Sequence, residues 1–432
     1  MIARSDRSAA SRDPLAWCWA ITAAFLALSL HRLGLPSKPY FDEVHYLPAA
    51  RALLALGAPL NTEHPMLGKE LIALGIAVLG DNPWGWRLPA ALAGAGALFA
   101  AMRALWWASL SRAATLLFGV LLATDFVLLV TARIAMLDAF MLAFAMTALW
   151  LCARAVRRSD PARAERDLAL AGVALGLSLA SKWSGASVAI LPGLAFAAVR
   201  WHTLRGRRSA WLTARDAAPV PGVALIDAAV WLGLVPLVVY FASFAPALSL
   251  REGAILIADL PALQLRMAEL QSSVVQPHPY QSRWWQWLLD LRPIWYLYEV
   301  ADGAQRGVLF LGNPLTMLAG LPALGAAFAW GLARREPAMI AVAVLWAASF
   351  GMWLVANKPV QFYYHYLLPS GFLIAALALV LGRWWERGRR WPGLAMAVGS
   401  TALFAYFYPI LTAAPLADEQ AFLAYAWLDS WR

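Results

Sequence analysis

Long apolar runs follow one another along almost the whole chain, and short polar stretches separate them. The runs are continuous rather than alternating, which indicates helices, and most approach the roughly 17–25 residues that a helix needs to cross a bilayer. They predict about eleven transmembrane helices, over residues 15–33, 88–108, 113–131, 135–153, 168–182, 184–200, 227–247, 307–331, 338–356, 365–382 and 392–412. Because no low-complexity segment or separate soluble region interrupts them, we expect residues 1–432 to form one all-α, polytopic membrane domain.

Two polar segments are too long to be simple turns between these helices. Residues 34–87 contain an amphipathic stretch, 66–80, that predicts an interfacial helix. Residues 248–306 carry His278 and Arg283 among many tryptophans and tyrosines. We expect both segments to be large, structured outer loops.

Composition and charge support this topology and exclude other classes. The chain is 62% hydrophobic and 14% charged, whereas a soluble domain is typically about 45–50% apolar. The net charge of +10 does not indicate nucleic-acid binding, because most arginines lie in short loops that fall on one side of the membrane. The arginine bias places the N-terminus, with Arg4, Arg7 and Arg12, in the cytoplasm. The first apolar run has no small-residue cleavage site after it, so we expect it to be a retained helix.

The same topology gathers the titratable side chains on the outer side. All four lysines and most histidines fall in outer loops or at outer helix ends. Cys18 and Cys152 lie in apolar segments, so neither a disulfide nor a cysteine metal site is predicted. Any active site is therefore expected on the extracytoplasmic face.

An adjacent pair of acids, Asp42 and Glu43, follows the first predicted helix. Their side chains point in different directions in either a helix or an extended segment, so they cannot share one role. One of them could act as a general base while the other orients a neighbour. The alternative is that both acids only begin an interfacial helix, where they suit its positive end.

Three ionisable residues interrupt the later apolar runs. Arg133 and Asp138 lie where the third predicted helix meets the fourth, and Lys182 lies in a polar break between the fifth and sixth. Ionisable groups at membrane depth usually face a polar cavity or a partner. Cations there could bind a phosphate. The alternatives are mutual pairing of Arg133 with Asp138, outward snorkelling of Arg133, and a purely topological role for Lys182. A metal site at Asp42, Glu43, His45, Glu63 and His64 would have oxygen and nitrogen ligands but no diagnostic spacing.

Taken together, the motifs resemble the protein O-mannosyltransferase family, in particular its bacterial branch. The matching pieces are residues 41–46, 63–69, 133–138, 176–185, 312–314 and 363–369. The resemblance implies a GT-C-type membrane glycosyltransferase. It implies an inverting transfer of a monosaccharide, usually mannose, from a polyprenyl phosphate to a Ser or Thr hydroxyl of an exported protein. It also implies action at the outer face of the bacterial inner membrane, without a metal cofactor.

The family resemblance also implies roles for individual residues. Asp42 inherits the role of general base and Glu43 that of its supporting neighbour, while Arg133 and Lys182 would hold the donor phosphate. Substrate-binding or supporting roles are expected for His45, His64, Lys69, Asp138, Trp183, His278, Arg283, Tyr364 and His365.

Two departures from the family pattern and two rival functions stay open. Residues 248–306 are too few for the lectin-like domain that eukaryotic relatives carry in this loop, and Met66 stands where the family more often has a second proline. An enzyme of the same fold that glycosylates a lipid or envelope glycan, as lipid A aminoarabinose transferases do, would share the outer acids and cations. A lipid-linked sugar flippase would need polar residues through the bilayer midplane or paired broken helices, and the ionisable residues here gather at one face.

Overall fold

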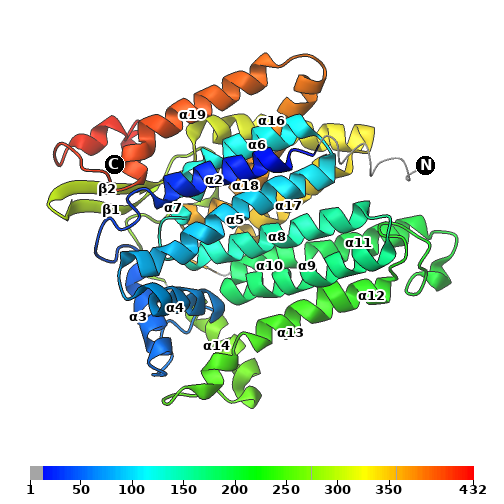
Figure 1. The fold of residues 1–432 in the computed structure, drawn as a ribbon, viewed down its shortest axis with the longest axis horizontal. Helices are drawn as coiled ribbons and strands as arrows, with labels where there is room; N and C mark the ends of the chain where they lie inside the picture. Colours follow the sequence, from blue (N-terminus) through cyan, green and yellow to red (C-terminus); the bar gives the residue numbers. More distant parts are fainter. Residues whose placement is uncertain (1–12, 274, 357) are drawn as a thin grey trace.

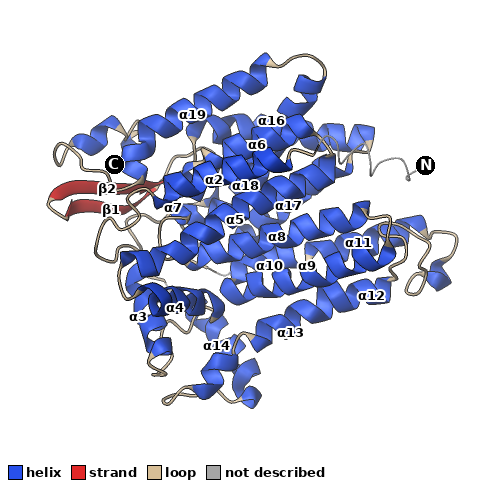
Figure 2. Ribbon diagram, viewed as in Figure 1, coloured by secondary structure: helices blue, strands red, loops and turns tan. Residues whose placement is uncertain are grey.

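The computed structural model describes residues 13–273, 275–356 and 358–432, and these form a mostly helical bundle with a small β-hairpin at one end (Figures 1 and 2). Arg4, Arg7 and Arg12, which contributed to the predicted orientation, lie outside the described residues. Most long helices run roughly parallel to one another across the picture, so their ends define two faces.

Among the described residues, eight helical segments are long and apolar enough to cross a membrane. These are α5 (Pro83–Ser109), α8 (Leu137–Arg157), α10–α11 (Trp183–Thr203), α12–α13 (Leu225–Ser249), α16 (Pro314–Arg334), α17 (Pro337–Val355), α18 (Tyr363–Glu386 with its first turn) and α19 (Trp391–Leu411). Helices α2 (Leu15–Leu30) and α6 (Arg112–Ala123) are shorter, and α7 (Phe126–Thr131) follows α6. Helix α9 (Pro161–Ser181) begins with several charged residues. Every predicted span thus overlaps helical structure, while the number that cross the membrane stays a prediction.

Helix α18 forms the centre of the bundle. It is almost entirely buried and packs against α6, α16, α17 and α19. On its other side, α5 packs against α8, α8 against α9, and α9 against α13 (Val235–Ala242). The helices that carry the motifs are therefore consecutive neighbours in the bundle.

A close backbone contact fixes α9 against its neighbour. A side-chain carbon at Gly172 would lie 1.8 Å from the carbonyl oxygen of Trp231, and one at Gly176 would lie 2.6 Å from that of Pro236. Glycines four residues apart let two membrane helices approach in this way. The contact meets a π-helical turn, Val230–Leu234, which precedes α13. It holds in place the helix whose end carries Lys182.

Several short elements gather at one end of the bundle, together with the C-terminus (Figure 1, left). They include α3 (Glu43–Leu54), α4 (Leu67–Leu79), α14 (Leu260–Ser272) and α15 (Trp284–Leu288). Shorter helical turns lie at Ala245–Ser249, Ile257–Asp259, Ala421–Ala424 and Asp429–Trp431. Another short turn, Arg208–Ala210, lies at the opposite end, in the loop after α11. The predicted interfacial helix over 66–80 corresponds to α4.

The β-hairpin was not predicted. Strands β1 (Ile294–Ala301) and β2 (Ala304–Phe310) pair antiparallel around Asp302 and Gly303, which both have positive φ. An Asp-Gly pair suits the tight turn of such a hairpin. A transmembrane helix predicted to begin at residue 307 therefore begins at Pro314 instead, and residues 304–310 belong to a strand.

Candidate active site

Asp42 lies in a tight turn immediately before α3, at the end of the bundle that carries the hairpin. The preceding residue, Phe41, has a φ of 49°, which turns the chain sharply. Its ring stacks on Tyr296 of β1 at 3.7 Å and meets the edge of Tyr364 at 6.2 Å. The hairpin and the segment before α18 therefore brace the turn that presents Asp42.

The surroundings of Asp42 suit a base that works near neutral pH. Burial raises the pKa of its carboxyl group to about 6. Lys182, His45 and Lys358 lower that pKa and Asp138 raises it, so all four groups lie within electrostatic range. A catalytic base is most efficient when its pKa lies near the working pH.

Lys182 and Asp138 form a buried ion pair next to this turn. The lysine ammonium donates to an aspartate carboxylate oxygen at 2.7 Å and lies 5.1 Å from the centre of the Tyr364 ring. Lys182 directly follows α9, whose Ser178 hydroxyl donates to the Met141 carbonyl of α8 at 3.0 Å. The fold thus brings together four predicted site residues, Asp42, Asp138, Lys182 and Tyr364, from four separate motifs.

Glu43 points into a different environment from Asp42. Its fully buried carboxylate accepts two hydrogen bonds from the Arg87 guanidinium, at 2.7 and 2.8 Å, and one from the Ala135 amide at 3.0 Å. Arg87 also donates to the carbonyls of Leu33, Pro36 and Lys38. Glu43 therefore anchors the loop that carries Asp42, and this arrangement argues against a direct catalytic role.

The position of Arg133 contradicts its predicted contact with the donor phosphate. Its guanidinium is buried and donates to the carbonyls of Ser29 at 2.5 Å, His31 at 2.6 Å and Arg32 at 3.2 Å. These carbonyls lie at the end of α2, where cations satisfy the last unpaired acceptors. Asp138 pairs with Lys182 rather than with Arg133. The Arg133 guanidinium therefore stabilises the end of α2, and its hydrogen bonds to these carbonyls leave it unsuited to bind the donor phosphate.

Lys69 and His64 shape the loop before α4. The buried ammonium of Lys69 donates to the carbonyls of Asn61 at 2.7 Å and His64 at 2.9 Å. Burial lowers the pKa of Lys69 to about 8 and holds the pKa of His64 well below its usual value. Neutral His64 packs edge-on against Tyr46 of α3. Lys69 therefore supports the first outer loop, while His64 also lies within electrostatic range of Lys182 and Lys358.

The remaining predicted site residues differ in their contacts and exposure. The Trp183 indole donates to the Tyr240 hydroxyl at 2.9 Å, which ties the Lys182 turn to α13. His365 is buried against Trp353 at 3.9 Å and accepts a hydrogen bond from the Phe362 amide. His278 and Arg283 are exposed, as is His45 at the start of α3.

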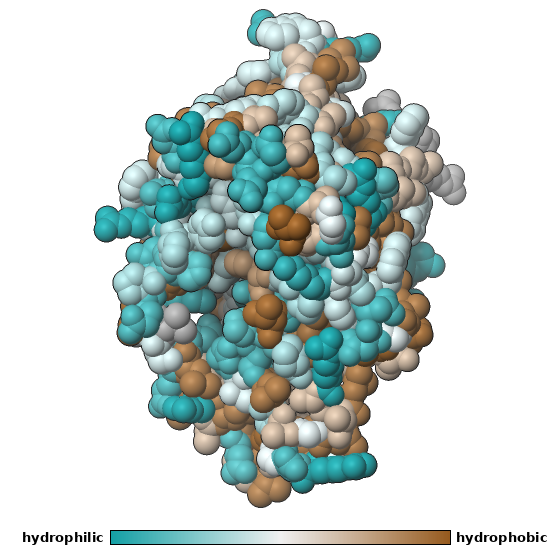
Figure 3. Space-filling view, turned by 90° about the vertical axis from the view of Figure 1, so that its left-hand side faces the viewer, coloured by the Kyte–Doolittle hydropathy of each residue, from teal (hydrophilic) through white to brown (hydrophobic). Residues whose placement is uncertain are grey.

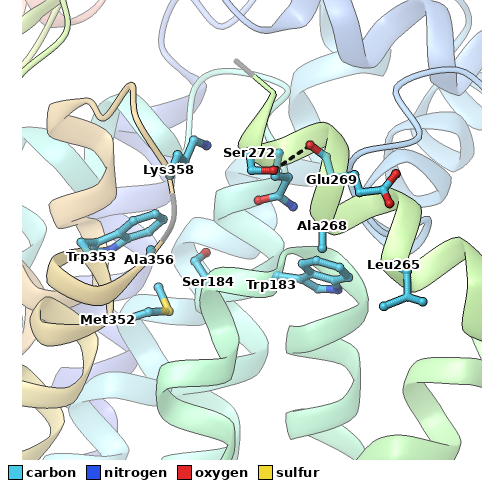
Figure 4. A pocket seen from close by; sticks show the side chains of 11 residues that line it. Trp183, Ser184, Leu265, Ala268, Glu269, Ser272, Met352, Trp353, Ala356 and Lys358 are labelled. Carbon is cyan, nitrogen blue, oxygen red and sulfur yellow. Dashed lines mark hydrogen bonds between the residues drawn. The ribbon is translucent and has the colours of Figure 1, made fainter. Parts of the chain in front are cut away.

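A cavity of about 570 Å³ opens beside this cluster (Figure 4). Helix α14 forms one wall through Leu265, Ala268, Glu269, Gln271 and Ser272, and the other side is lined by Trp183, Ser184, Met352, Trp353, Ala356 and Lys358. A recess is visible on this largely hydrophilic face of the molecule (Figure 3). Lys358 is a candidate site residue that was not predicted from the motifs. Its only signal in the sequence was its place among the four predicted outer lysines.

Within the described ranges, no group of three or more His, Cys, Asp or Glu side chains is placed to hold a metal ion. The candidate set of Asp42, Glu43, His45, Glu63 and His64 therefore forms no such group. Metal independence itself stays a prediction.

The two halves of the chain match two descriptions of one family. Residues 77–250 match the dolichyl-phosphate-mannose-protein mannosyltransferase family, and residues 256–431 match the C-terminal four-transmembrane region of protein O-mannosyltransferases. A polyprenol-phosphate-mannose–protein mannosyltransferase of Mycobacterium tuberculosis is 31% identical over 94% of this chain and 89% of its own length. A relative of the same name from Mycolicibacterium smegmatis is 30% identical over 96% of this chain and 93% of its own. The chain belongs to the protein O-mannosyltransferase family.

Solved structures confirm the predicted GT-C-type glycosyltransferase fold. The Pmt1-Pmt2 protein O-mannosyltransferase complex of S. cerevisiae, bound to the sugar donor, superimposes with a TM-score of 0.78 over 96% of this chain and 92% of the matched chain, at 14% identity. ArnT from Cupriavidus metallidurans, bound to undecaprenyl phosphate, gives 0.58 over 96% of this chain and 79% of its own, at 13% identity. At these identities the likeness concerns the fold alone. The family match, together with the apolar helices, makes this protein a multi-pass membrane glycosyltransferase.

Proposed function

We propose that this protein transfers mannose from a polyprenyl phosphate to a Ser or Thr hydroxyl of an exported protein. The observation that carries the proposal is the match, over nearly the whole chain, to relatives named polyprenol-phosphate-mannose–protein mannosyltransferase. The clustering of Asp42 with Lys182 and Asp138 supports it, because this cluster contains a base and a cation beside a cavity.

In the proposed reaction, Asp42 removes the proton of the acceptor hydroxyl as the oxygen attacks the anomeric carbon. The bond between that carbon and the phosphate oxygen breaks, and the polyprenyl phosphate leaves with the bonding electron pair. Attack from the face opposite the phosphate inverts the anomeric centre. A single displacement needs no second carboxylate as nucleophile, unlike a retaining glycosidase. This agrees with the burial of Glu43 away from Asp42.

Lys182 is proposed to stabilise the leaving phosphate. Its ammonium is fixed by Asp138 at 2.7 Å and by the Tyr364 ring, so little reorganisation is needed when negative charge develops. Asp138 holds the lysine ammonium in position through this ion pair, and acts through it rather than on the sugar.

The proposed location is the inner membrane of a bacterium, with the N-terminus in the cytoplasm and the Asp42 face outside. The arginine distribution supports this orientation. Transfer to a lipid or envelope glycan is the second candidate, because the ArnT fold is also similar. The names of the relatives favour a protein acceptor over that candidate.

A transfer assay tests the proposal directly. Membranes that contain the protein are incubated with polyprenyl-phosphate [¹⁴C]mannose, and label is expected in protein. Label that enters only lipid would refute the protein acceptor, and no transfer at all would refute the donor.

Variants test the proposed base in the same assay. Asp42→Asn should abolish transfer while the protein stays inserted and monodisperse. Lys38→Met is the control, since Lys38 makes an exposed ion pair with Glu299 on the same face. Near-normal turnover by Asp42→Asn would place the base elsewhere.

A further inference from the structure

Lys358 differs from the other three lysines because its ammonium has no partner among the described residues. Lys38 pairs with Glu299, Lys69 donates to two carbonyls, and Lys182 pairs with Asp138. No hydrogen bond or ion pair of the Lys358 ammonium occurs within the part of the chain that the structure describes. Only its backbone amide is engaged, by the Ala356 carbonyl at 2.8 Å.

The side chain of Lys358 is half-buried and lines the 570 Å³ cavity together with Trp183 and Trp353 (Figure 4). This volume lies in the range of small-ligand sites, about 300–1,000 Å³. A partly desolvated cation without a counter-ion raises the free energy of the protein. An anion bound in the cavity would remove that cost.

The charges around the cavity point to one kind of anion. Lys358 lies within electrostatic range of Lys182, Asp42, Asp138 and Glu63. Its pKa is lowered to about 8, mainly by burial and also by Lys182, while the three carboxylates oppose this shift. Asp138 already compensates Lys182. Lys358 is therefore a cation near Asp42 that forms no ion pair with a carboxylate of the described residues.

A cation in this position would stabilise the negative charge that develops on the phosphate during sugar transfer. A donor phosphodiester carries one negative charge, whereas the released phosphate monoester carries about −1.5 to −2 at pH 7. A fixed positive charge stabilises the products and the transition state more than the donor. Trp183 and Ser184, which directly follow Lys182, line the same cavity as Lys358. Lys182 itself lies within electrostatic range of Lys358.

We propose that Lys358 contacts the phosphate of the polyprenyl-phosphate sugar and of the released polyprenyl phosphate, opposite Lys182. Lys358 would thus have the phosphate-binding role that the sequence analysis predicted for Arg133. The inference rests on the proposed function for the identity of the donor, but the phosphate contact can be measured without any sugar transfer.

A binding experiment tests the contact. Purified wild-type protein, Lys358→Met, Lys358→Arg and the exposed control Lys38→Met are titrated with decaprenyl phosphate, with decaprenol and with phosphatidylglycerol. Quenching of tryptophan fluorescence is the readout, since Trp183 and Trp353 border the cavity. Lys358→Met should weaken the binding of decaprenyl phosphate about ten- to a hundredfold, as expected for loss of a charged hydrogen bond. Lys358→Arg and Lys38→Met should retain most of the affinity.

The lipid probes separate the phosphate from its possible sources. Binding of decaprenol should not change in Lys358→Met, because the alcohol lacks the phosphate. An equal loss for decaprenol, or unchanged affinity for decaprenyl phosphate, would overturn the proposal. Phosphatidylglycerol that binds as tightly as decaprenyl phosphate, and equally depends on Lys358, would show a general phospholipid site and overturn the assignment to the donor.

Transfer kinetics separate this inference from the proposed function. Lys358→Met should lower kcat more than it raises KM, since the added charge appears only during transfer. Wild-type protein that binds decaprenyl phosphate through Lys358 but moves no mannose would support the phosphate contact and refute the proposed function. Normal mannose transfer, together with decaprenyl phosphate binding that does not depend on Lys358, would support the proposed function and refute the phosphate contact. The Lys358→Arg variant keeps the positive charge and serves as a control for a folding defect in Lys358→Met.

Discussion

Two neighbouring carboxylates in this protein have opposite surroundings. Asp42 faces a group of charged side chains, and burial raises its pKa to about 6. Glu43 is enclosed by Arg87 and backbone amides and has no open side. The sequence alone predicted that the two acids must diverge. Which one faces the substrate followed only from the family resemblance, because Arg87 lies 44 residues away along the chain.

The pKa values of Asp42 and Lys358 predict a bell-shaped dependence of kcat/KM on pH. Asp42 must be deprotonated to act as a base, so activity should rise as the pH increases through about 6. Lys358 must be protonated to stabilise phosphate, so activity should fall as the pH increases through about 8. The groups facing Asp42 are Lys182, Asp138, His45 and Lys358. Those facing Lys358 are Lys182, Asp42, Asp138, Glu63, His64 and His365. Initial rates measured from pH 5 to 9 would check the profile.

The Lys358→Met variant assigns the alkaline side of that profile. Lys69 also has a pKa of about 8, but its ammonium is bound to the carbonyls of Asn61 and His64 away from Asp42. The variant should therefore keep the rise near pH 6 and lose the fall near pH 8. A fall that persists in Lys358→Met would assign it to another group.

Arg133 shows the limit of predicting a site from motifs. An arginine at membrane depth suggested an anion partner, yet its partners are carbonyls at the end of α2, about a hundred residues earlier. Backbone carbonyls leave no signal in the sequence, so this interaction could not be predicted. Lys358 was missed for the complementary reason, since its importance comes from the absence of a partner within the described residues.

At the scale of elements, the crossing of α9 with α13 gives a sharp prediction. Gly172→Ala should destabilise the protein by at least about 1–3 kcal/mol, because the new methyl group would lie 1.8 Å from the rigid Trp231 carbonyl. Gly325→Ala on α16 is the matched control, since nothing lies within 4 Å of the added carbon. Thermal unfolding in detergent compares the two. Equal melting temperatures for Gly172→Ala and the wild-type protein would contradict the close contact.

Helices were predictable from the sequence and the hairpin was not. Continuous apolar runs place the helices because the lipid requires internal backbone hydrogen bonding. Residues 294–310 also contain many apolar side chains, and most of both strands is buried. A buried strand and a buried helix cannot be separated by apolar content alone. The Asp302-Gly303 pair was the local signal that could have indicated a hairpin.

At the scale of the whole molecule, one end of the bundle carries the chemistry. The hairpin contacts the Asp42 turn through Tyr296 and Phe41, and Lys38 pairs with Glu299 of β1. The opposite end holds the loop after α11, with Arg205, Arg207 and Arg208 exposed (Figure 1). This polarity agrees with an outer active face and an arginine-rich inner face.

The orientation of the two ends can be measured by cysteine labelling. In a Cys18→Ala, Cys152→Ala background, Val300→Cys on the hairpin, where the valine is 64% exposed, should react with a membrane-impermeant maleimide in intact spheroplasts. Ser209→Cys, exposed in the loop after α11, should react only after lysis. Both sites are solvent-exposed, so a difference between them reports the side of the membrane rather than burial. Labelling of Ser209→Cys before lysis, with Val300→Cys protected, would invert the topology. It would then place Asp42 in the cytoplasm, where an exported acceptor has not yet crossed the membrane.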